Sequence, residues 1–267
     1  MKKAFRPAFI IFVLIFLYAP ILLLIFYSFT SATTIGAVRG FSLHNYVTLF
    51  TTEELREMII GTIWLAVISA IFATLLGTFG AIGSFYSSKK ANVFMSSLNQ
   101  VPVVNADVVT GFSICILLVE VFGIEKDTFI PLVAGHVLLC APFVYLSVMP
   151  KLKQMDPYLY EAALDLGATP FKALRSIVIP QISSGIISGF ALAITLSLDD
   201  YFIATYTKPS TFDTISTYVV NATKGAQTTI KTALWALCAV IFIIVVLIVM
   251  LSNLRTMRSN RKERAVT

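Results

Sequence analysis

Apolar residues fill long runs of this chain, and short polar segments separate the runs. Six runs are long enough to cross a bilayer, which an α-helix does in about 20 residues at about 1.5 Å each. None shows the two-residue alternation of a barrel strand, and a helix satisfies its own backbone polar groups, as lipid requires. The pattern predicts an all-α membrane protein, a single domain over residues 1–267, with spans at about 8–29, 60–83, 101–122, 130–149, 183–206 and 233–252.

Composition agrees with this prediction. Hydrophobic residues make up 57% of the chain and charged residues 13%, whereas soluble domains hold about 45–50% and about 25%. The three cysteines, all inside predicted spans without motif spacing, are expected to be buried free thiols. His44 and His136 are too few and too far apart in the sequence to suggest a metal site. We therefore expect no metal and no cofactor.

The distribution of basic residues predicts the orientation of the spans. If the N-terminus is cytoplasmic, fourteen of the 20 Lys and Arg residues lie in cytoplasmic segments and six in outer ones. This positive-inside bias predicts that both termini are cytoplasmic. The first run is too long for a secretory signal and is expected to be an uncleaved anchor. The net charge of +6 is therefore a topology signal and gives no reason to expect nucleic acid.

Residues 150–182 form a polar segment between predicted spans four and five, on the cytoplasmic side in this orientation. Asp156-Pro157 and Thr169-Pro170 are both typical helix starts, with a capping oxygen followed by proline. Gly167 suits a left-handed position at a helix end. The segment is therefore predicted to hold two short helices bent at Gly167, with Pro180 preceding the fifth span and an apolar stripe formed by Leu159, Ala162, Ala163 and Leu166.

Two interpretations of this segment remain open from periodicity alone. The helices can lie on lipid headgroups, helped by Lys172 and Arg175. Alternatively, they can dock on another protein, because Ala162 and Ala163 permit close approach and Glu161 can pair with a basic residue there.

The run Glu161-Ala162-Ala163, with Gly167 and then Ile177, Ile179 and Pro180 at fixed distances, resembles the EAA loop of bacterial ABC-importer permeases. The resemblance extends along nearly the whole chain, and the chain is similar to the spermidine/putrescine (polyamine) branch. It implies a type I ABC-importer permease (MetI-like) fold in the bacterial inner or plasma membrane. Isoleucine at 179 replaces the more usual leucine.

The resemblance also implies partners. A cytoplasmic ATP-binding subunit would dock at Glu161, Ala162, Ala163, Gly167 and Pro180, and a second homologous permease subunit would complete the translocation path. An extracytoplasmic polyamine-binding protein would deliver the substrate. The chain contains no phosphate-loop motif, so ATP would be bound by the partner, and this chain itself is expected not to be an enzyme. Heterodimer and homodimer both remain open.

Four acids fall within the predicted spans: Asp107, Glu120, Asp199 and Asp200. A carboxylate near a helix centre costs about 2.5–3.5 kcal/mol on insertion scales, so each needs a compensating partner. A cationic substrate would compensate Asp199 and Asp200, with Tyr201 adding a cation–π contact. Alternatively, either acid can pair with a lysine or a backbone donor and stabilise the helix bundle.

Asp107 and Glu120 lie thirteen residues apart on one predicted span, so on a straight helix they point about 140° away from each other. Asp107 resembles a polar site in the polyamine branch, whereas Glu120 is expected to be structural. The predicted substrate pathway therefore comprises Asp199, Asp200, Asp107 and Tyr201.

Three other functions compete with polyamine import. One is an ABC permease for another small solute, and another is a self-contained proton-coupled transporter that uses the four acids as a relay. The third is an intramembrane serine protease using Ser113 and His136, but the segment Gly111–Cys115 lacks the second glycine of a nucleophile elbow.

Overall fold

The computed structural model describes residues 2–32, 40–156, 158–224, 232–243 and 246. Within these residues the regular structure is helical, and one isolated antiparallel bridge joins Thr30 and Phe41. The chain divides into two units, which are described separately: residues 57–218, and the residues up to 56 with those from 219 onward.

The unit formed by both ends of the chain contains α1 (Lys2–Ser28), α2 (His44–Thr51), the start of α3 (Glu53–Tyr86), the end of α11 (Ile215–Lys224) and an apolar helix at Thr232–Ile243. The short helix α2 lies in the segment between α1 and α3. Asn45 anchors it by donating to the carbonyl oxygens of Ser28 and Thr30. The predicted span at 233–252 is described only to residue 243 and at residue 246, so its remainder lies outside the described residues.

The unit of residues 57–218 contains most of α3, then α4 (Lys89–Val104), α5 (Asp107–Ile116), the π-helix η1 (Leu117–Val121) and α6 (Phe129–Gln154). After α6 come α7 (Tyr158–Asp165), α8 (Pro170–Ala173), the π-helix η2 (Leu174–Val178), α9 (Ile179–Asp199) and α10 (Phe202–Thr207), before the start of α11. In the described residues, four helices are long and apolar enough to span a membrane, or five if the bent pair α4–α5 counts as one.

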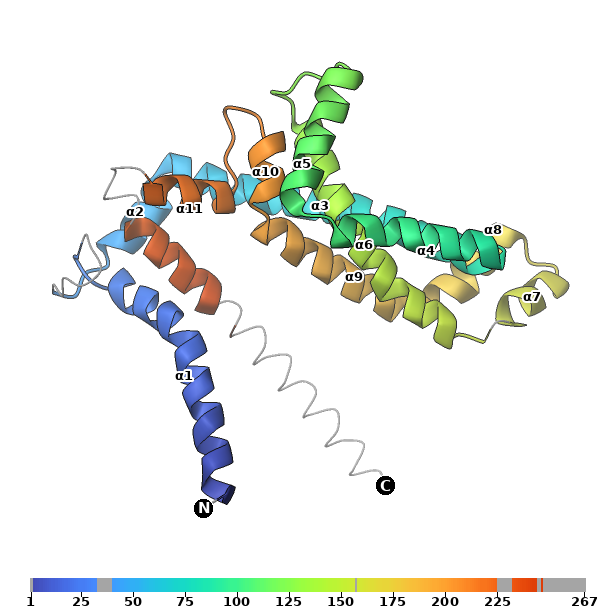
Figure 1. Ribbon diagram of the computed structural model, residues 1–267, viewed down its shortest axis with the longest axis horizontal. Coiled ribbons are helices and arrows are strands. Elements are labelled where there is room, and N and C mark those ends of the chain that lie inside the picture. Colours follow the sequence, from blue (N-terminus) through green and yellow to red (C-terminus); the bar gives the residue numbers. More distant parts are fainter. Residues whose placement is uncertain (1, 33–39, 157, 225–231, 244–245, 247–267) are drawn as a thin grey trace. The chain divides into compact units, whose positions relative to one another are not determined.

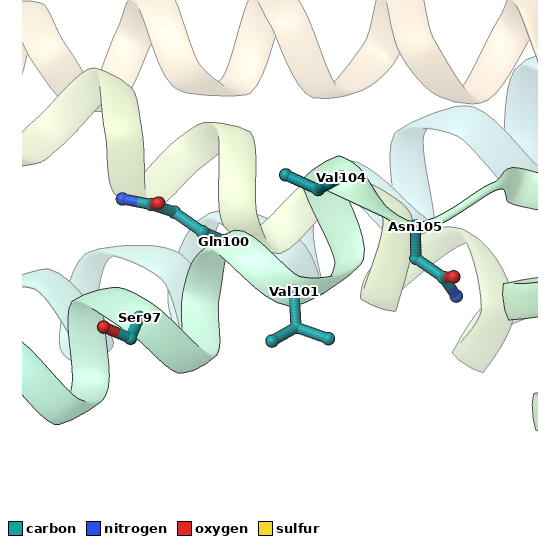
Figure 2. Close-up of a pocket in the computed structure, with 5 residues that line it drawn as sticks. All are labelled: Ser97, Gln100, Val101, Val104 and Asn105. Atoms are coloured by element: carbon teal, nitrogen blue, oxygen red, sulfur yellow. The ribbon is translucent and has the colours of Figure 1, made fainter.

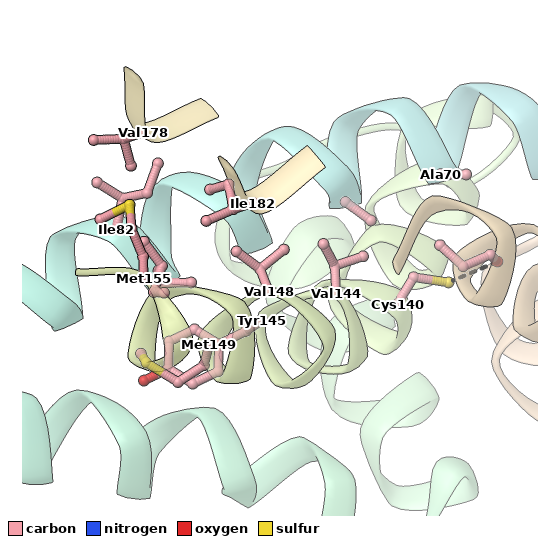
Figure 3. Packing of buried hydrophobic residues seen from close by; sticks show 14 residues of the cluster. Ala70, Ile82, Cys140, Val144, Tyr145, Val148, Met149, Met155, Val178 and Ile182 are labelled. Atoms are coloured by element: carbon pink, nitrogen blue, oxygen red, sulfur yellow. Dashed lines mark hydrogen bonds between the residues drawn. The ribbon is translucent and has the colours of Figure 1, made fainter. Parts of the chain in front are cut away.

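The core of this unit lies between α3, α6 and α9 (Figure 3). Val144 and Val148 of α6 are fully buried at its centre. Close approach is possible because glycines face α6: a Cβ on Gly185 would lie 2.9 Å from the Ser147 carbonyl oxygen, and one on Gly189 would lie 3.2 Å from Val144 Cα. The Gly185/Gly189 pair therefore serves packing within the subunit.

A ring of hydrogen bonds joins α4 to α3 and α6. Tyr145 Oη donates to Ser84 Oγ at 2.9 Å and lies 2.9 Å from Ser96 Oγ. Ser96 donates to Asn92 Oδ1, and Asn92 Nδ2 donates to the Ser84 carbonyl oxygen. Polar groups that would be costly in an apolar environment thus satisfy one another.

The prediction of one straight helix over residues 101–122 is wrong. The helix axis turns by 105° between α4 and α5 (Figure 1), at Asn105 and Ala106, both of which have extended or near-extended backbone. Pro102 lies one turn before the break, and Asn105 Nδ2 donates to Thr110 Oγ1 across it. The break precedes Asp107, so Asp107 and Glu120 still lie on one helical segment, Asp107–Val121, which ends in the π-helix η1.

Pro180 was predicted to precede the fifth span, but it does not mark a boundary between two helices. Residues Pro170–Asp199 form one continuous helix of 30 residues. Proline removes a helical N–H and crowds the carbonyl four residues earlier. Here the π-helix η2 immediately precedes it, with the Ile179 N–H reaching the Leu174 carbonyl, and this wider turn accommodates the ring.

Candidate functional site

The helix of predicted span 183–206 ends earlier than expected, and the break exposes one acid while burying the next. α9 stops at Asp199, Asp200 takes an extended conformation, and α10 begins at Phe202. We call Asp199, Asp200 and Tyr201 the α9–α10 junction. Asp199 is exposed, Tyr201 is partly buried and Asp200 is 8% exposed.

The Asp200 carboxylate caps α10. Its Oδ1 accepts from the Ile203 backbone N–H at 3.2 Å, and its Oδ2 accepts from the Ala204 N–H at 2.8 Å. A carboxylate at a helix N-terminus satisfies N–H groups that have no partner within the helix. The cap explains why an otherwise continuous apolar run breaks at this point.

The capped helix α10 lies tightly between α5 and α6. A Cβ on Gly111 of α5 would lie 2.9 Å from Ile203 Cα, and one on Gly135 of α6 would lie 2.6 Å from Ile203 Cγ2. Ile203 and Ala204 are fully buried as a result. Two glycines thus set the position of α10.

A buried histidine faces the cap, and sequence reasoning missed this contact. His136 of α6 is fully buried, and its Nε2 lies 3.7 Å from Asp200 Oδ2 while its Nδ1 lies 2.9 Å from the Leu132 carbonyl oxygen. Among the described contacts the ring is engaged by Leu132 and Asp200, which leaves the alternative of a Ser113–His136 pair without support. The signal available in the sequence was a polar residue at 136 in an apolar run, but nothing there pointed to position 200.

Asp107, the third predicted pathway acid, is exposed in the first turn of α5, a position that favours a negative charge. It begins α5, which packs against α10 where Gly111 meets Ile203, so Asp107 lies on a helix that contacts the element following the junction. Just before it, Ser97, Gln100, Val101, Val104 and Asn105 line an open hollow of about 410 Å³ at the end of α4 (Figure 2). The structure thus brings Asp107 toward the junction. Glu120 lies apart in η1 and is exposed.

The second predicted site is the α7–α8 segment, residues 158–173. Its two helix starts are as predicted: Asp156 Oδ1 accepts from the Tyr158 N–H at 3.0 Å, and Thr169 Oγ1 accepts from the Lys172 N–H at 3.4 Å. Pro157 lies outside the described residues. The expectation of a second short helix is wrong, since α8 continues through η2 into α9.

Gly167 ends α7 with a φ of +83°, which confirms the prediction of a left-handed residue at this helix end. The Gly167 N–H donates to the Leu164 carbonyl at 2.9 Å, and the Ala168 N–H donates to the Ala163 carbonyl at 3.0 Å. This pair of bonds is a Schellman motif, which a residue with a Cβ adopts only at a cost.

The residues of the predicted apolar stripe of α7 do not share one environment: some pack on the core and others are exposed. Ala163 is buried, and Leu159 and Tyr160 pack on the core, with the Tyr160 and Tyr86 ring centroids 4.9 Å apart. In contrast, Glu161 and Ala162 are exposed, and Leu166 is 89% exposed. Pro180 is also exposed, within the long helix. Phe171 of α8 is 72% exposed, so the segment presents large apolar side chains that the described chain does not cover.

The chain matches the family model described as the binding-protein-dependent transport system inner membrane component over residues 73–261. It is 32% identical over 209 residues to the spermidine/putrescine transport system permease protein PotC of Escherichia coli (strain K12), covering 78% of each chain. It is 35% identical over 197 residues to the putrescine transport system permease protein PotI of the same strain, covering 72% of this chain and 70% of that one.

A solved bacterial ABC transporter involved in importing the acidic polysaccharide alginate has a chain similar to this one, with a TM-score of 0.71, 22% sequence identity and 95% of each chain covered. At this identity the likeness concerns the fold. It confirms the predicted all-α ABC-importer permease fold.

Proposed function

Because the chain belongs to the family of binding-protein-dependent transport system inner membrane components, we propose that it is the permease subunit of an ATP-driven ABC importer that takes up polyamines. The proposal that the substrate is a polyamine rests on the sequence identity of the chain, 32% and 35%, to two relatives named for spermidine and putrescine transport. The multi-pass helices and the family make it an inner-membrane transport protein. We propose that both termini are cytoplasmic, on the strength of the positive-inside bias.

In this proposal the α9–α10 junction and Asp107 border the translocation pathway. Asp199 and Asp107 are exposed acids, and the described salt bridges leave them without a basic partner. A linear polycation would supply that partner, and the aromatic face of Tyr201 would add a cation–π contact. Low dielectric strengthens each such contact relative to water. The hollow beside Asn105 would extend the pathway along α4.

Asp200 also belongs to this pathway region in the proposal, but its contacts differ from those of Asp199. Its two oxygens already accept backbone N–H groups, and its side chain is nearly inaccessible. A direct bond to substrate would have to displace the cap of α10. We therefore assign direct contact to Asp199, Asp107 and Tyr201.

Energy would come from a separate cytoplasmic ATP-binding subunit docked on the α7–α8 segment. The exposed Leu166 and Phe171 fit such an interface, because large apolar side chains gain about 1.5–3 kcal/mol each when buried. Glu161 is exposed beside them and is available to a basic residue of the ATPase. Ala162 permits close approach, while Ala163, Gly167 and Pro180 would act by shaping the segment.

Two further partners complete the proposal. A second homologous permease subunit would supply the other half of the pathway. An extracytoplasmic binding protein would deliver the polyamine, as the family description implies. A related alginate transporter has been solved in complex with its substrate-bound periplasmic protein. We propose no cofactor for this chain, since ATP would bind to the partner.

Uptake of radiolabelled spermidine and putrescine by the reconstituted complex tests the substrate. We expect ATP-dependent accumulation by the wild type and a loss of about tenfold or more in apparent affinity for Asp199→Asn, because a charge-assisted contact contributes about 1.5–3 kcal/mol. Glu120→Gln is the matched control, an exposed acid of η1 that should leave uptake unchanged. An intact complex that hydrolyses ATP but accumulates neither polyamine refutes the assignment.

Stimulation of ATP hydrolysis tests the docking site. Glu161→Lys should reduce the hydrolysis stimulated by substrate and binding protein while the permease still inserts normally. Full stimulation in this variant would remove Glu161 from the interface.

A further inference from the structure

Both ring nitrogens of His136 face oxygen atoms inside the protein, and among the described residues only Nδ1 makes a hydrogen bond. A carbonyl oxygen can only accept, so the Nδ1 that lies 2.9 Å from the Leu132 carbonyl carries the hydrogen. Nε2, 3.7 Å from Asp200 Oδ2, then faces a carboxyl group. Nε2 makes no hydrogen bond within the described part of the chain, but it lies within ion-pair distance of the Asp200 carboxyl group. A protonated His136 is thus the internal counter-charge available to Asp200.

Asp200 is also stabilised by the start of α10. Its oxygens accept the N–H groups of Ile203 and Ala204 at the start of α10, where the helix dipole favours negative charge. A buried carboxylate with this set of partners is compensated without any substrate.

We infer that His136 and Asp200 form a buried positioning pair, which fixes the turn between α9 and α10 and so holds the neighbouring Asp199 in its exposed position toward the substrate cation. The pair joins α6 to the junction. The tight contacts of Ile203 with Gly111 and Gly135 hold α10 in its position. The identity of the cation rests on the proposed function, whereas the pair itself does not.

Comparing two neighbouring acids tests this division of roles in the reconstituted complex. Asp199→Asn should raise KM for spermidine about tenfold and leave the melting temperature unchanged, because it removes a charge that faces substrate. Asp200→Asn keeps one oxygen to cap α10 but loses the ion pair. It should lower the melting temperature and the maximal rate with KM within about twofold of wild type. An equal rise in KM in both variants, or an unchanged melting temperature and rate for Asp200→Asn, overturns the inference.

A rescue experiment separates charge compensation from packing. His136→Leu keeps a side chain of similar size but leaves the Asp200 charge buried without its partner, which is more costly than removing both members of a pair. The double variant His136→Leu/Asp200→Asn should therefore melt at a higher temperature and transport faster than His136→Leu alone. The matched control, His136→Leu/Asp199→Asn, should show no such recovery.

A failure of the His136–Asp200 pair can be distinguished from a failure of the proposed function. Rescue of the melting temperature is measured without substrate, so it supports the pair even if the wild type imports neither polyamine. A double variant no more stable than His136→Leu means that His136 acts through packing alone and refutes the pair. If His136→Leu does not insert, the comparison of Asp199→Asn with Asp200→Asn decides.

Discussion

At the α9–α10 junction a carboxylate is buried and fully partnered, whereas in the α7–α8 segment large apolar side chains are exposed. Asp200 is 8% exposed and accepts two backbone N–H groups, with His136 facing it. Leu166 is 89% exposed and Phe171 72% exposed. The junction compensates its unfavourable group internally. The α7–α8 segment does not, which is typical of a surface that another protein or a membrane covers.

The largest expected effect comes from crowding the junction. Gly111→Val should reduce transport more than tenfold, because its Cβ would lie 2.9 Å from the backbone Cα of Ile203 and must push α10 away. Uptake by the reconstituted complex measures this effect. Gly83→Val is the matched control on α3, where a Cβ meets nothing within 4 Å, and it should retain most of the activity. Equal losses in the two variants would show that α10 does not need its present position.

The next effect concerns the shape of the α7–α8 segment. Gly167→Val forces a branched residue to a φ of +83°, which costs roughly 1–2 kcal/mol and should change the angle between α7 and α8. We expect substrate-stimulated ATP hydrolysis to fall several-fold while the isolated permease still inserts. Gly123→Val carries the same kind of strain at a φ of +66°, outside this segment, and should leave stimulation intact. Loss of stimulation in both would assign the effect to general destabilisation.

A smaller effect is expected when the exposed apolar surface is made polar. Leu166→Ser should weaken binding of the ATP-binding subunit about tenfold, since burial of a leucine contributes about 1.5–3 kcal/mol. The melting temperature of the isolated permease should not change, because this side chain is 89% exposed. Affinity measured with the purified ATPase checks the first statement, and thermal unfolding of the isolated permease checks the second. Val148→Ser, at a fully buried core position, is the contrasting variant and should lower the melting temperature. Unchanged affinity would contradict the docking surface.

The smallest effect involves Asp127, an exposed carboxylate that, like Asp200, accepts a backbone N–H. The Ser210 N–H donates to its Oδ1 at 2.8 Å, and this bond lowers the pKa of Asp127 below its ordinary value. A lowered pKa means that the stabilisation is present above the ordinary value and is lost as the pH falls through the folded value. The difference in melting temperature between wild type and Asp127→Asn should therefore be small near neutral pH and vanish in acid. A difference independent of pH would contradict this contact.

The spans at 8–29, 60–83 and 130–149 were predictable because an apolar run of bilayer length is a strong and local signal. The helix caps at Asp156 and Thr169 and the left-handed Gly167 were also predictable, since each depends on neighbouring residues alone. The breaks at Asn105 and Asp200 were missed, because the apolar pattern runs through both of them. Continuity across Pro180 was missed for the opposite reason: a π-turn absorbs a residue that normally ends a helix.

The site was predictable only as a set of residue types. Sequence identified Asp199 and Asp200 as adjacent acids, but whether each faces solvent or protein depends on a break in the helix that no periodicity shows. The contact between His136 and Asp200 joins α6 to the α9–α10 junction, and such contacts follow from packing rather than from local sequence. Whether Asp107 and Asp199 meet a polyamine stays a prediction.

The continuous helix Pro170–Asp199 has a mechanical consequence. At about 1.5 Å per residue its 30 residues span about 45 Å, with Phe171 near one end and Asp199 at the other. A rod of this length works as a lever: a tilt of about 10° around one end displaces the other by about 8 Å, more than one helical turn. If the proposed ATP-binding subunit docks beside Phe171, a small rotation there would thus become a much larger displacement at Asp199.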